Sequence, residues 1–287
     1  MTRTLIVGGL TIDRFLDGSV APGGSILHSG LAAASDGAVV TMLTVAGDEP
    51  AARDGIERLR SIGEVVCQQA TSTTVYRHEE RDGVRVLMLE GRSGPITAHG
   101  LQGLERPEVA LVAPIADEVP SSLVERLVED VAPARLVLLI QGWLRRLSIG
   151  DEVHPLPLHT LSDEQERVLA HADAIVVSTE DLIESPGDPF AQAAALRRRA
   201  GPRPIVVVTL GIEGYVLDDP AHDRVIASVP RRVVTDVSAV GAGDTFGAAM
   251  ALNLARAMDA HAAADVATDR VIAMLEARRR DAEHRTS

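Results

Sequence analysis

The sequence predicts an α/β fold, namely a doubly wound, mainly parallel sheet flanked by helices, with a small β-sheet standing off it as a lid. Strand-length runs of apolar and β-branched residues recur along the chain, at residues 5–7, 39–44, 109–113, 136–140, 174–177 and 205–209. Stretches with helical spacing lie between them, at residues 50–61, 121–128, 163–170, 191–199 and 244–257. Continuous apolar runs indicate strands buried on both faces. Alternation of strand and helix indicates parallel crossover connections.

Two regions depart from this alternation and predict the lid, at residues 13–20 and 73–89. Their polar and apolar side chains alternate too strongly for strands that are buried on both faces. The second region holds two strand-like runs around a turn at residues 80–83, which is typical of a β-hairpin. We expect one domain over residues 1–287 with these strands inserted as a lid over a cleft. An ordinary edge hairpin is the alternative.

The composition limits both the core and the partners. With 46% hydrophobic but only 2% aromatic residues, the core must be built from aliphatic side chains. The 41 acidic against 28 basic residues give a net charge of −13, which repels polyanions and argues against nucleic acid as a partner. The chain has no Lys, so a catalytic lysine is excluded. Phosphate must then be held by Arg, backbone N–H groups or a metal.

The single cysteine and the first residues indicate the compartment. Cys67 has no partner for an internal disulfide and lies in an apolar run, so we expect a buried structural thiol in a reducing environment. Residues 1–9 hold only a short apolar run, too short for a secretion signal or a membrane span. We therefore expect a cytoplasmic protein without a membrane partner.

The most informative segment is a glycine-rich turn that runs directly into a helix of small residues and carries Asp244. Glycines let the backbone approach a ligand closely. The free N–H groups at a helix N-terminus favour negative charge, such as that of a phosphoryl group in transfer. A carboxylate placed there can take a proton from a hydroxyl, and a simple helix-capping role is the alternative.

This segment, Val240-Gly241-Ala242-Gly243-Asp244-Thr245-Phe246, resembles the C-terminal signature of ribokinase-like (PfkB) carbohydrate kinases. The resemblance implies that Asp244 takes the proton from the acceptor hydroxyl. It also implies that the amides of Gly241, Ala242 and Gly243 form an anion hole, and that ATP and Mg²⁺ are required. Family members usually carry Asp-Thr-Thr before the first glycine. This chain has Ser238-Ala239-Val240 there, which leaves weakened activity open.

A second resemblance lies near the N-terminus and concerns the phosphate acceptor. Asp13 follows the glycines after the first strand, and Gly23 and Gly24 open a helix that contains His28. The resemblance implies that Asp13 and the glycine turn bind the acceptor's hydroxyls. A carboxylate can accept two hydrogen bonds from a vicinal diol. His28 either reads the substrate or lies on the helix surface as an ordinary polar residue.

Gln141 and Arg145 complete the predicted substrate side. They follow the strand at residues 136–140, and ligands bind at the carboxyl ends of strands in parallel sheets. Some relatives carry a similar Gln-Gly-aromatic-x-Arg segment. Trp143, which lies between the two, is a candidate for stacking on a ring, and a half-buried structural Trp is the alternative.

The donor side is predicted from two further segments. The Thr-x-Gly-x-x-Gly pattern formed by Thr209, Gly211 and Gly214 resembles the family loop that covers the nucleotide. Ser178 and Asp181 stand at the spacing of the family's Asn-x-x-Glu. The resemblance implies nucleotide contact at Ser178.

The acid of that Asn-x-x-Glu element helps to place Mg²⁺ in the family. Asp181 or Glu180 is its counterpart here, and the metal assignment falls on these two residues. The alternative is that these acidic residues cap the start of a helix and bind no metal.

These features predict a PfkB-type carbohydrate kinase that transfers phosphoryl groups from ATP to a hydroxyl of a small sugar, sugar alcohol or cyclitol. The alternatives are a nucleoside kinase of the same family, or a non-catalytic sugar- or nucleotide-binding protein that has lost transfer. The scarcity of aromatic rings argues against a nucleoside pocket. Retention of Asp244 argues against loss of transfer. Family members often pair their lids in dimers, which suggests a homodimer through the lid.

Overall fold

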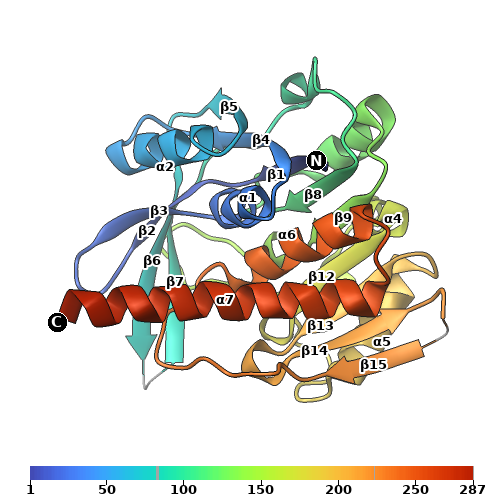
Figure 1. Cartoon of the computed structure of the whole chain (residues 1–287). Helices are drawn as coiled ribbons and strands as arrows, with labels where there is room; N and C mark the ends of the chain where they lie inside the picture. The colour runs from blue at the N-terminus through green and yellow to red at the C-terminus, as the bar shows by residue number, and fades with distance from the viewer. Residues whose placement is uncertain (82–83, 223, 287) are drawn as a thin grey trace.

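The computed structural model describes residues 1–81, 84–222 and 224–286 (Figure 1). The strands are β1 (Arg3–Gly8), β2 (Thr11–Arg14), β3 (Val20–Gly23), β4 (Val39–Ala46), β5 (Glu64–Gln69), β6 (Thr74–Arg81), β7 (Val84–Gly91), β8 (Val109–Ala113), β9 (Leu136–Leu139), β10 (Arg145–Arg146), β11 (His154–Pro155), β12 (Ala174–Ser178), β13 (Ile205–Thr209), β14 (Tyr215–Asp219) and β15 (Arg224–Ser228). The helices are α1 (Ser25–Ser35), α2 (Pro50–Arg60), α3 (Ser121–Arg126), α4 (Asp163–His171), α5 (Pro189–Ala200), α6 (Ala242–Ala255) and α7 (Ala260–Thr286).

The main sheet has nine strands in the order β15-β14-β13-β12-β9-β8-β1-β4-β5. The strands from β13 to β5 pair in parallel, while β14 and β15 add an antiparallel edge. The predicted α/β class and mainly parallel sheet are confirmed. Cys67 lies on the edge strand β5 and is only half-buried, because that strand has a neighbour on one side alone. Our expectation of a fully buried thiol was wrong.

Helices cover both faces of this sheet because its strands are apolar on both faces. In β1, Ile6 belongs to the core beneath α1, α2, α6 and α7, whereas Leu5 and Val7 belong to the core beneath α3, α4 and α5. Adjacent side chains of a strand point to opposite faces, so one strand supplies both cores. Aliphatic side chains dominate both clusters. Figure 1 shows α7 as the longest helix, and none of the described helices is long and apolar enough to cross a membrane.

A separate four-stranded sheet, in the order β3-β2-β6-β7, stands off the main one (Figure 1). Its central pair β2–β6 is parallel and its outer pairs are antiparallel. The first expected lid segment, residues 13–20, is not one strand: it holds the end of β2, a turn and the first residue of β3. Gly18 there takes a left-handed φ of 79°, and the Asp17 carboxylate accepts the Ser19 N–H. Of the turn expected at residues 80–83, residues 80 and 81 belong to β6, and residues 82 and 83 lie outside the described residues.

The carboxyl ends of the parallel strands share one edge of the main sheet, and chain direction changes there. The connection from β1 leads through α1 to β4 on one side, while β8 pairs with β1 on the other. Ligands bind at such switch points in doubly wound sheets. The loops after β1, β8, β9, β12 and β13 therefore define the region where a site is expected.

Candidate active site

Asp244 lies in the first turn of α6 and is 6% exposed. Its side chain does not cap the helix, and its Oδ1 atom has no hydrogen-bond partner among the described residues. Burial raises its pKa to about 7. The Arg145 guanidinium opposes this rise, and the Asp181 and Asp13 carboxylates add to it. A buried, unpaired carboxyl that titrates near neutrality is suited to accept a proton from a bound hydroxyl.

The turn that leads into α6 places backbone N–H groups beside this carboxyl. Gly241 precedes the first helical residue and adopts a left-handed φ of 77°, which L side chains rarely adopt. The first N–H groups of a helix have no partner within it. The Ala242 N–H donates to the Ala239 carbonyl at 3.0 Å, so it is not available to a ligand in this structure. Of the three predicted anion-hole amides, those of Gly241 and Gly243 stand at the positive end of α6, where they can bind an anion.

His28 projects from α1 against this turn. A β-carbon built on Gly241 would lie only 2.3 Å from His28 Cγ, so the imidazole lies directly against the glycine. The ring is buried, and its Nε2 atom has no hydrogen-bond partner among the described residues. Burial lowers the His28 pKa to about 4. The Arg278 charge lowers it further, and the Asp13 carboxylate opposes both effects. The ring is thus neutral near pH 7, and its position rules out the helix-surface alternative.

Arg145 is a partly buried cation near Asp244, with its side chain 17% exposed. It directly follows a short 3₁₀ helix, Gln141–Leu144, which comes just after the carboxyl end of β9. Its guanidinium donates to Gln141 Oε1 at 3.1 Å and to Asp181 Oδ1 at 3.3 Å. Burial is the largest single influence and would lower the pKa of Arg145, but Asp181, Tyr76 and Asp244 together raise it, so the charge is kept. A fixed guanidinium beside Asp244 can bind phosphate oxygens.

Asp13 forms the opposite end of the site, on β2 of the small sheet. Its Oδ1 accepts the Thr11 hydroxyl at 3.0 Å, and His78 Nε2 lies 3.7 Å from its Oδ2. A β-carbon on Gly23 would lie 2.2 Å from Asp13 Oδ2, and one on Gly24 would lie 2.3 Å from the Gly9 carbonyl oxygen. The two glycines are therefore required for the carboxylate and the backbone to approach so closely.

Tyr76, His78 and Glu118 lie near this site and were not identified as site residues from the sequence. Tyr76 donates to the Ile115 carbonyl at 2.9 Å and is electrostatically coupled to Arg145. Glu118 accepts the Ile115 and Ala116 N–H groups, and burial raises its pKa. The strand period of two places Tyr76 and His78 on one face of β6, which is a usable signal. Nothing in the residues around Glu118 indicated its position.

The predicted nucleotide-binding residues lie at the carboxyl ends of two neighbouring strands. Ser178 on β12 and Thr209 on β13 are direct partners in the register. The Ser178 hydroxyl accepts the Glu180 N–H, so it caps the short helix that follows. Gly211 and Gly214 have φ values of 59° and 103°, as the tight turn from β13 into β14 requires.

The segment at residues 229–240 runs from that glycine turn to the anion hole. A β-carbon on Gly214 would lie 3.0 Å from the Val229 α-carbon, and residue 240 directly precedes Gly241. Arg278 of α7 donates to the carbonyl oxygens of Ser238 at 2.8 Å and Val240 at 2.7 Å. α7 continues past Arg278 to Thr286, and Arg278 holds the segment in place.

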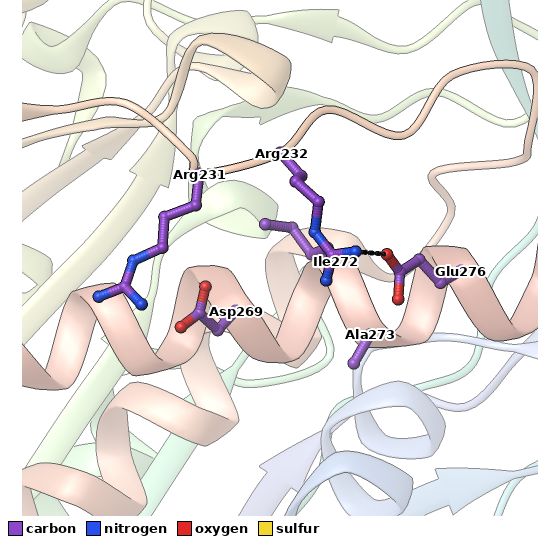
Figure 2. A pocket seen from close by; sticks show the side chains of 6 residues that line it. All are labelled: Arg231, Arg232, Asp269, Ile272, Ala273 and Glu276. Atoms are coloured by element: carbon purple, nitrogen blue, oxygen red, sulfur yellow. Dashed lines mark ion pairs between the residues drawn. The ribbon is translucent and has the colours of Figure 1, made fainter.

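A small cavity separates this segment from α7. It has a volume of about 220 Å³ and is lined by Arg231, Arg232, Asp269, Ile272, Ala273 and Glu276 (Figure 2). One α7 residue between these, Met274, accepts the Thr245 hydroxyl at 3.3 Å, and Thr245 stands beside Asp244 in α6. The cavity is thus next to the anion-hole end of α6.

The two residues expected to hold a metal, Asp181 and Glu180, differ in burial. Asp181 is buried and offers one carboxylate that Arg145 contacts, whereas Glu180 is exposed. In the described part of the chain, the cluster with metal-ligand spacing is Asp219, His222 and Asp259, at the opposite edge of the sheet. Mg²⁺ in kinases binds mainly to phosphates with one or two carboxylates. Asp181 fits a site in which the metal is held by donor phosphates together with one carboxylate. Around Asp181, the described residues do not form a cluster that could hold a metal without such phosphates.

Trp143 does not lie open to a ligand. It is 6% exposed and packs in the core beneath α3 to α5, where its indole N–H donates to the Val119 carbonyl at 2.9 Å. The candidate role of ring stacking was therefore wrong, and Trp143 is a structural residue that is buried rather than half-buried. The aliphatic core needs large side chains at a few places, and this is one of them.

Several known structures share this architecture. A pyrophosphate-dependent kinase in the ribokinase family, complexed with a pyrophosphate analog and myo-inositol, matches with a TM-score of 0.77 and 20% identity over 92% of each chain. Ribokinase from Thermotoga maritima matches with a TM-score of 0.69 and 14% identity, over 94% of this chain and 92% of that one.

Ribokinase from Arabidopsis thaliana, complexed with ribose and ATP, matches with a TM-score of 0.72 and 17% identity, over 94% of this chain and 91% of that one. A search of curated protein sequences finds no match. The family model described as pfkB family carbohydrate kinase matches residues 11–277, which is nearly the whole chain. The chain therefore belongs to the pfkB family of carbohydrate kinases.

Proposed function

We propose that this kinase transfers a phosphoryl group from ATP to a hydroxyl of a small unphosphorylated sugar, sugar alcohol or cyclitol. The observation that carries the proposal is the buried, unpaired carboxyl of Asp244, with a pKa of about 7, beside the N-terminus of α6. Phosphoryl transfer needs a base near the nucleophile and fixed positive charge around the moving phosphoryl group. Both features meet here.

In this proposal Asp244 accepts the proton of the acceptor hydroxyl as that oxygen attacks the terminal phosphorus of the donor. The amides of Gly241 and Gly243 donate to the equatorial phosphoryl oxygens, while the Ala242 N–H holds the turn through the Ala239 carbonyl. Arg145, held by Asp181 and Gln141, supplies a fixed positive charge close to Asp244. His28 is neutral and buried, so it contributes a hydrogen bond rather than a charge.

The acceptor is proposed to bind at the end of the site that includes the small sheet. Asp13, Gly23 and Gly24 form a carboxylate and a close backbone turn that suit vicinal hydroxyls. A cyclitol is supported by the neighbour that was complexed with myo-inositol, and a pentose by the neighbour that was complexed with ribose. The small sheet is proposed to act as a lid, and a homodimer through it stays a prediction.

The donor is proposed to lie against Ser178, Thr209 and the glycine turn between β13 and β14. ATP is the donor that the kinase family implies. Mg²⁺ bound to its phosphates would neutralise the charge that develops during transfer, and Asp181 is the carboxylate placed to join that shell. Glu180 is not proposed as a ligand because it is exposed.

The test is an activity screen with MgATP. Purified protein is incubated with pentoses, ketohexoses, cyclitols and nucleosides, and ADP release is followed above the rate without acceptor. One class of polyol is expected to raise ADP release, and the Asp244→Asn variant is expected to lose this stimulation while it still binds both substrates. Binding of ATP and polyol without any turnover by the native protein would instead favour a non-catalytic binding protein. A response to nucleosides alone would favour the nucleoside kinase alternative.

A further inference from the structure

Arg278 of the C-terminal helix α7 reaches the turn that opens α6. The two helices pack against each other and run in opposite directions (Figure 1). The Thr245 hydroxyl in the first turn of α6 donates to Met274 Sδ at 3.3 Å, and Arg278 stands about one turn further along α7. There the Arg278 Nη1 atom donates to the carbonyl oxygens of Ser238 at 2.8 Å and Val240 at 2.7 Å. An arginine of the last helix thus binds the backbone directly before the anion hole.

Little else in the described part of the chain fixes residues 235–240. Most of them are exposed, so apolar packing does not hold the segment. Its other hydrogen bonds join near neighbours, as between Thr235 and Asp236 or between Val240 and Ser238. The two bonds from Arg278 instead join the segment to a distant element. They therefore set the position of the backbone that enters the anion hole.

The same contact acts on the peptide group that supplies the first anion-hole amide. The Val240 carbonyl and the Gly241 N–H belong to one planar, resonant peptide group. A cation at the carbonyl oxygen draws electron density toward that oxygen and makes the N–H of the same peptide a stronger donor. The Gly241 N–H has no hydrogen-bond partner among the described residues, so a ligand can use this stronger donor.

The Arg278 charge is not neutralised by a carboxylate in the described part of the chain. Arg145, by contrast, pairs with Asp181 at 3.3 Å. Partial burial lowers the pKa of Arg278, but an arginine in this setting keeps its charge near neutral pH. The Arg278 charge also lowers the pKa of His28, whose ring lies against Gly241. The cation therefore stands within electrostatic reach of the anion hole.

We propose that Arg278 is a positioning residue of the anion hole, which fixes and polarises the Val240–Gly241 peptide so that its N–H binds the phosphoryl group in transfer. This inference rests on the proposed function, in which the Gly241 amide donates to a phosphoryl oxygen. A donor aimed at charge that develops in the transition state raises kcat more than it tightens substrate binding. The contribution of Arg278 therefore falls on turnover.

Steady-state kinetics with MgATP and the best polyol acceptor test this role. Arg278→Gln is expected to lower kcat by about 10–100-fold, less than the roughly 100–1,000-fold that follows loss of a whole oxyanion donor. The KM for the acceptor should not change, because the proposed acceptor contacts lie at the small sheet. A higher acceptor KM with native kcat would place Arg278 in substrate binding and would overturn the proposal.

Two further variants separate this role from general damage to α7. One nitrogen of Arg278 makes both carbonyl contacts, so the single ammonium of Arg278→Lys, with three donors, should recover part of the lost kcat. Arg280→Gln is the matched control, because Arg280 is exposed and points away from Arg278 around the same helix. It should keep the native kcat. Equal losses in Arg278→Gln and Arg278→Lys, or native kcat in Arg278→Gln, would overturn the proposal.

Amide NMR of the full chain distinguishes failure of this inference from failure of the proposed function, because it needs no turnover. The Gly241 amide proton is expected to move upfield in Arg278→Gln but not in Arg280→Gln, since its peptide loses the cation at the Val240 carbonyl. Titration with inorganic phosphate should shift this signal in the native protein and shift it less in Arg278→Gln.

A Gly241 signal that is the same in the native protein and in Arg278→Gln, with and without phosphate, overturns the inference even when the native protein is an active kinase. Absence of turnover with every acceptor overturns the proposed function instead. In that case the response of the Gly241 signal to phosphate still decides whether Arg278 supports an anion-binding amide.

Discussion

The imidazole of His28 lies directly against the α-carbon of Gly241, so that helix α1 and the anion-hole turn are in contact through one ring and one glycine. A β-carbon at position 241 would lie 2.3–2.6 Å from three ring atoms. Gly241 also has a φ of 77°. Two independent constraints, space and backbone conformation, therefore exclude any side chain at the position where the turn enters α6.

Gly241→Ala is expected to destabilise the protein and to reduce turnover by at least about 100-fold, because the oxyanion-binding amides move with the turn. The matched control is Gly37→Ala. Gly37 has the same φ of 77°, but a β-carbon there would meet no atom within 4 Å. A left-handed L-residue costs about 1–2 kcal/mol, and Gly37→Ala should lose no more than this. Thermal unfolding would contradict the prediction if both variants lost the same stability.

The pH dependence of turnover is expected to report Asp244. Its pKa is raised to about 7, and the ionised form is the base. The kcat/KM for the acceptor should therefore rise with pH and level off above about pH 8, with an apparent pKa near 7. An acid limb centred near pH 4 would show that the titrating carboxyl is exposed, and would remove Asp244 from that role.

Asp244→Asn is expected to raise stability while it abolishes turnover. The folded pKa of about 7 exceeds the ordinary value of 3.8, so the native state binds more protons than the unfolded state between these pH values. The free energy of unfolding of the native protein therefore falls as pH rises from about 4 to 7. The neutral amide escapes this loss. The variant should be more stable by about 1–3 kcal/mol at pH 8 and by almost nothing at pH 4, as measured by urea unfolding.

The mainly parallel sheet could be predicted because its apolar strands alternate with helices over most of the chain. The site was predictable where a short motif carries the chemistry, as at Asp244 and Gly241. Residues whose role depends on contacts with distant parts of the chain could not be predicted from the sequence. Arg278 stands 38 residues after Val240, whose carbonyl it binds, and Glu118 becomes buried only when the loop after β8 packs beside Gly9. No local sequence pattern predicts such tertiary contacts.

Other departures have equally local causes. Trp143 was a candidate for ligand stacking because it follows a strand. In the structure its indole N–H donates a hydrogen bond to the Val119 carbonyl inside the core. Residues 15–19 were expected to continue a lid strand, yet they form a turn in which Gly18 takes a left-handed φ. In each case one tertiary contact or one backbone conformation outweighed the sequence pattern.

Arg145→Gln is expected to lower turnover by at least about 100-fold and to move the acid limb to higher pH. The Arg145 charge lowers the Asp244 pKa, so its removal leaves Asp244 facing Asp181 and Asp13 without compensation. Arg145→Lys keeps the charge but not the planar guanidinium, so it should slow turnover with the limb unmoved. A limb that stays in place in Arg145→Gln would show that the two groups are not coupled.

Asp13→Asn is expected to raise the KM for the acceptor by about 10–100-fold and to leave donor affinity unchanged. The amide keeps the shape of the carboxylate beside Gly23 but loses its negative charge and one acceptor atom. Asp17→Asn, in the exposed turn of the same sheet, is the control and should keep the native KM, because the Asp17 carboxylate accepts its side-chain hydrogen bonds from Ser19 within the turn. Steady-state kinetics with varied acceptor, together with donor titration, separates the effects. Loss of donor affinity in Asp13→Asn would move this residue from the acceptor end of the site to the donor end.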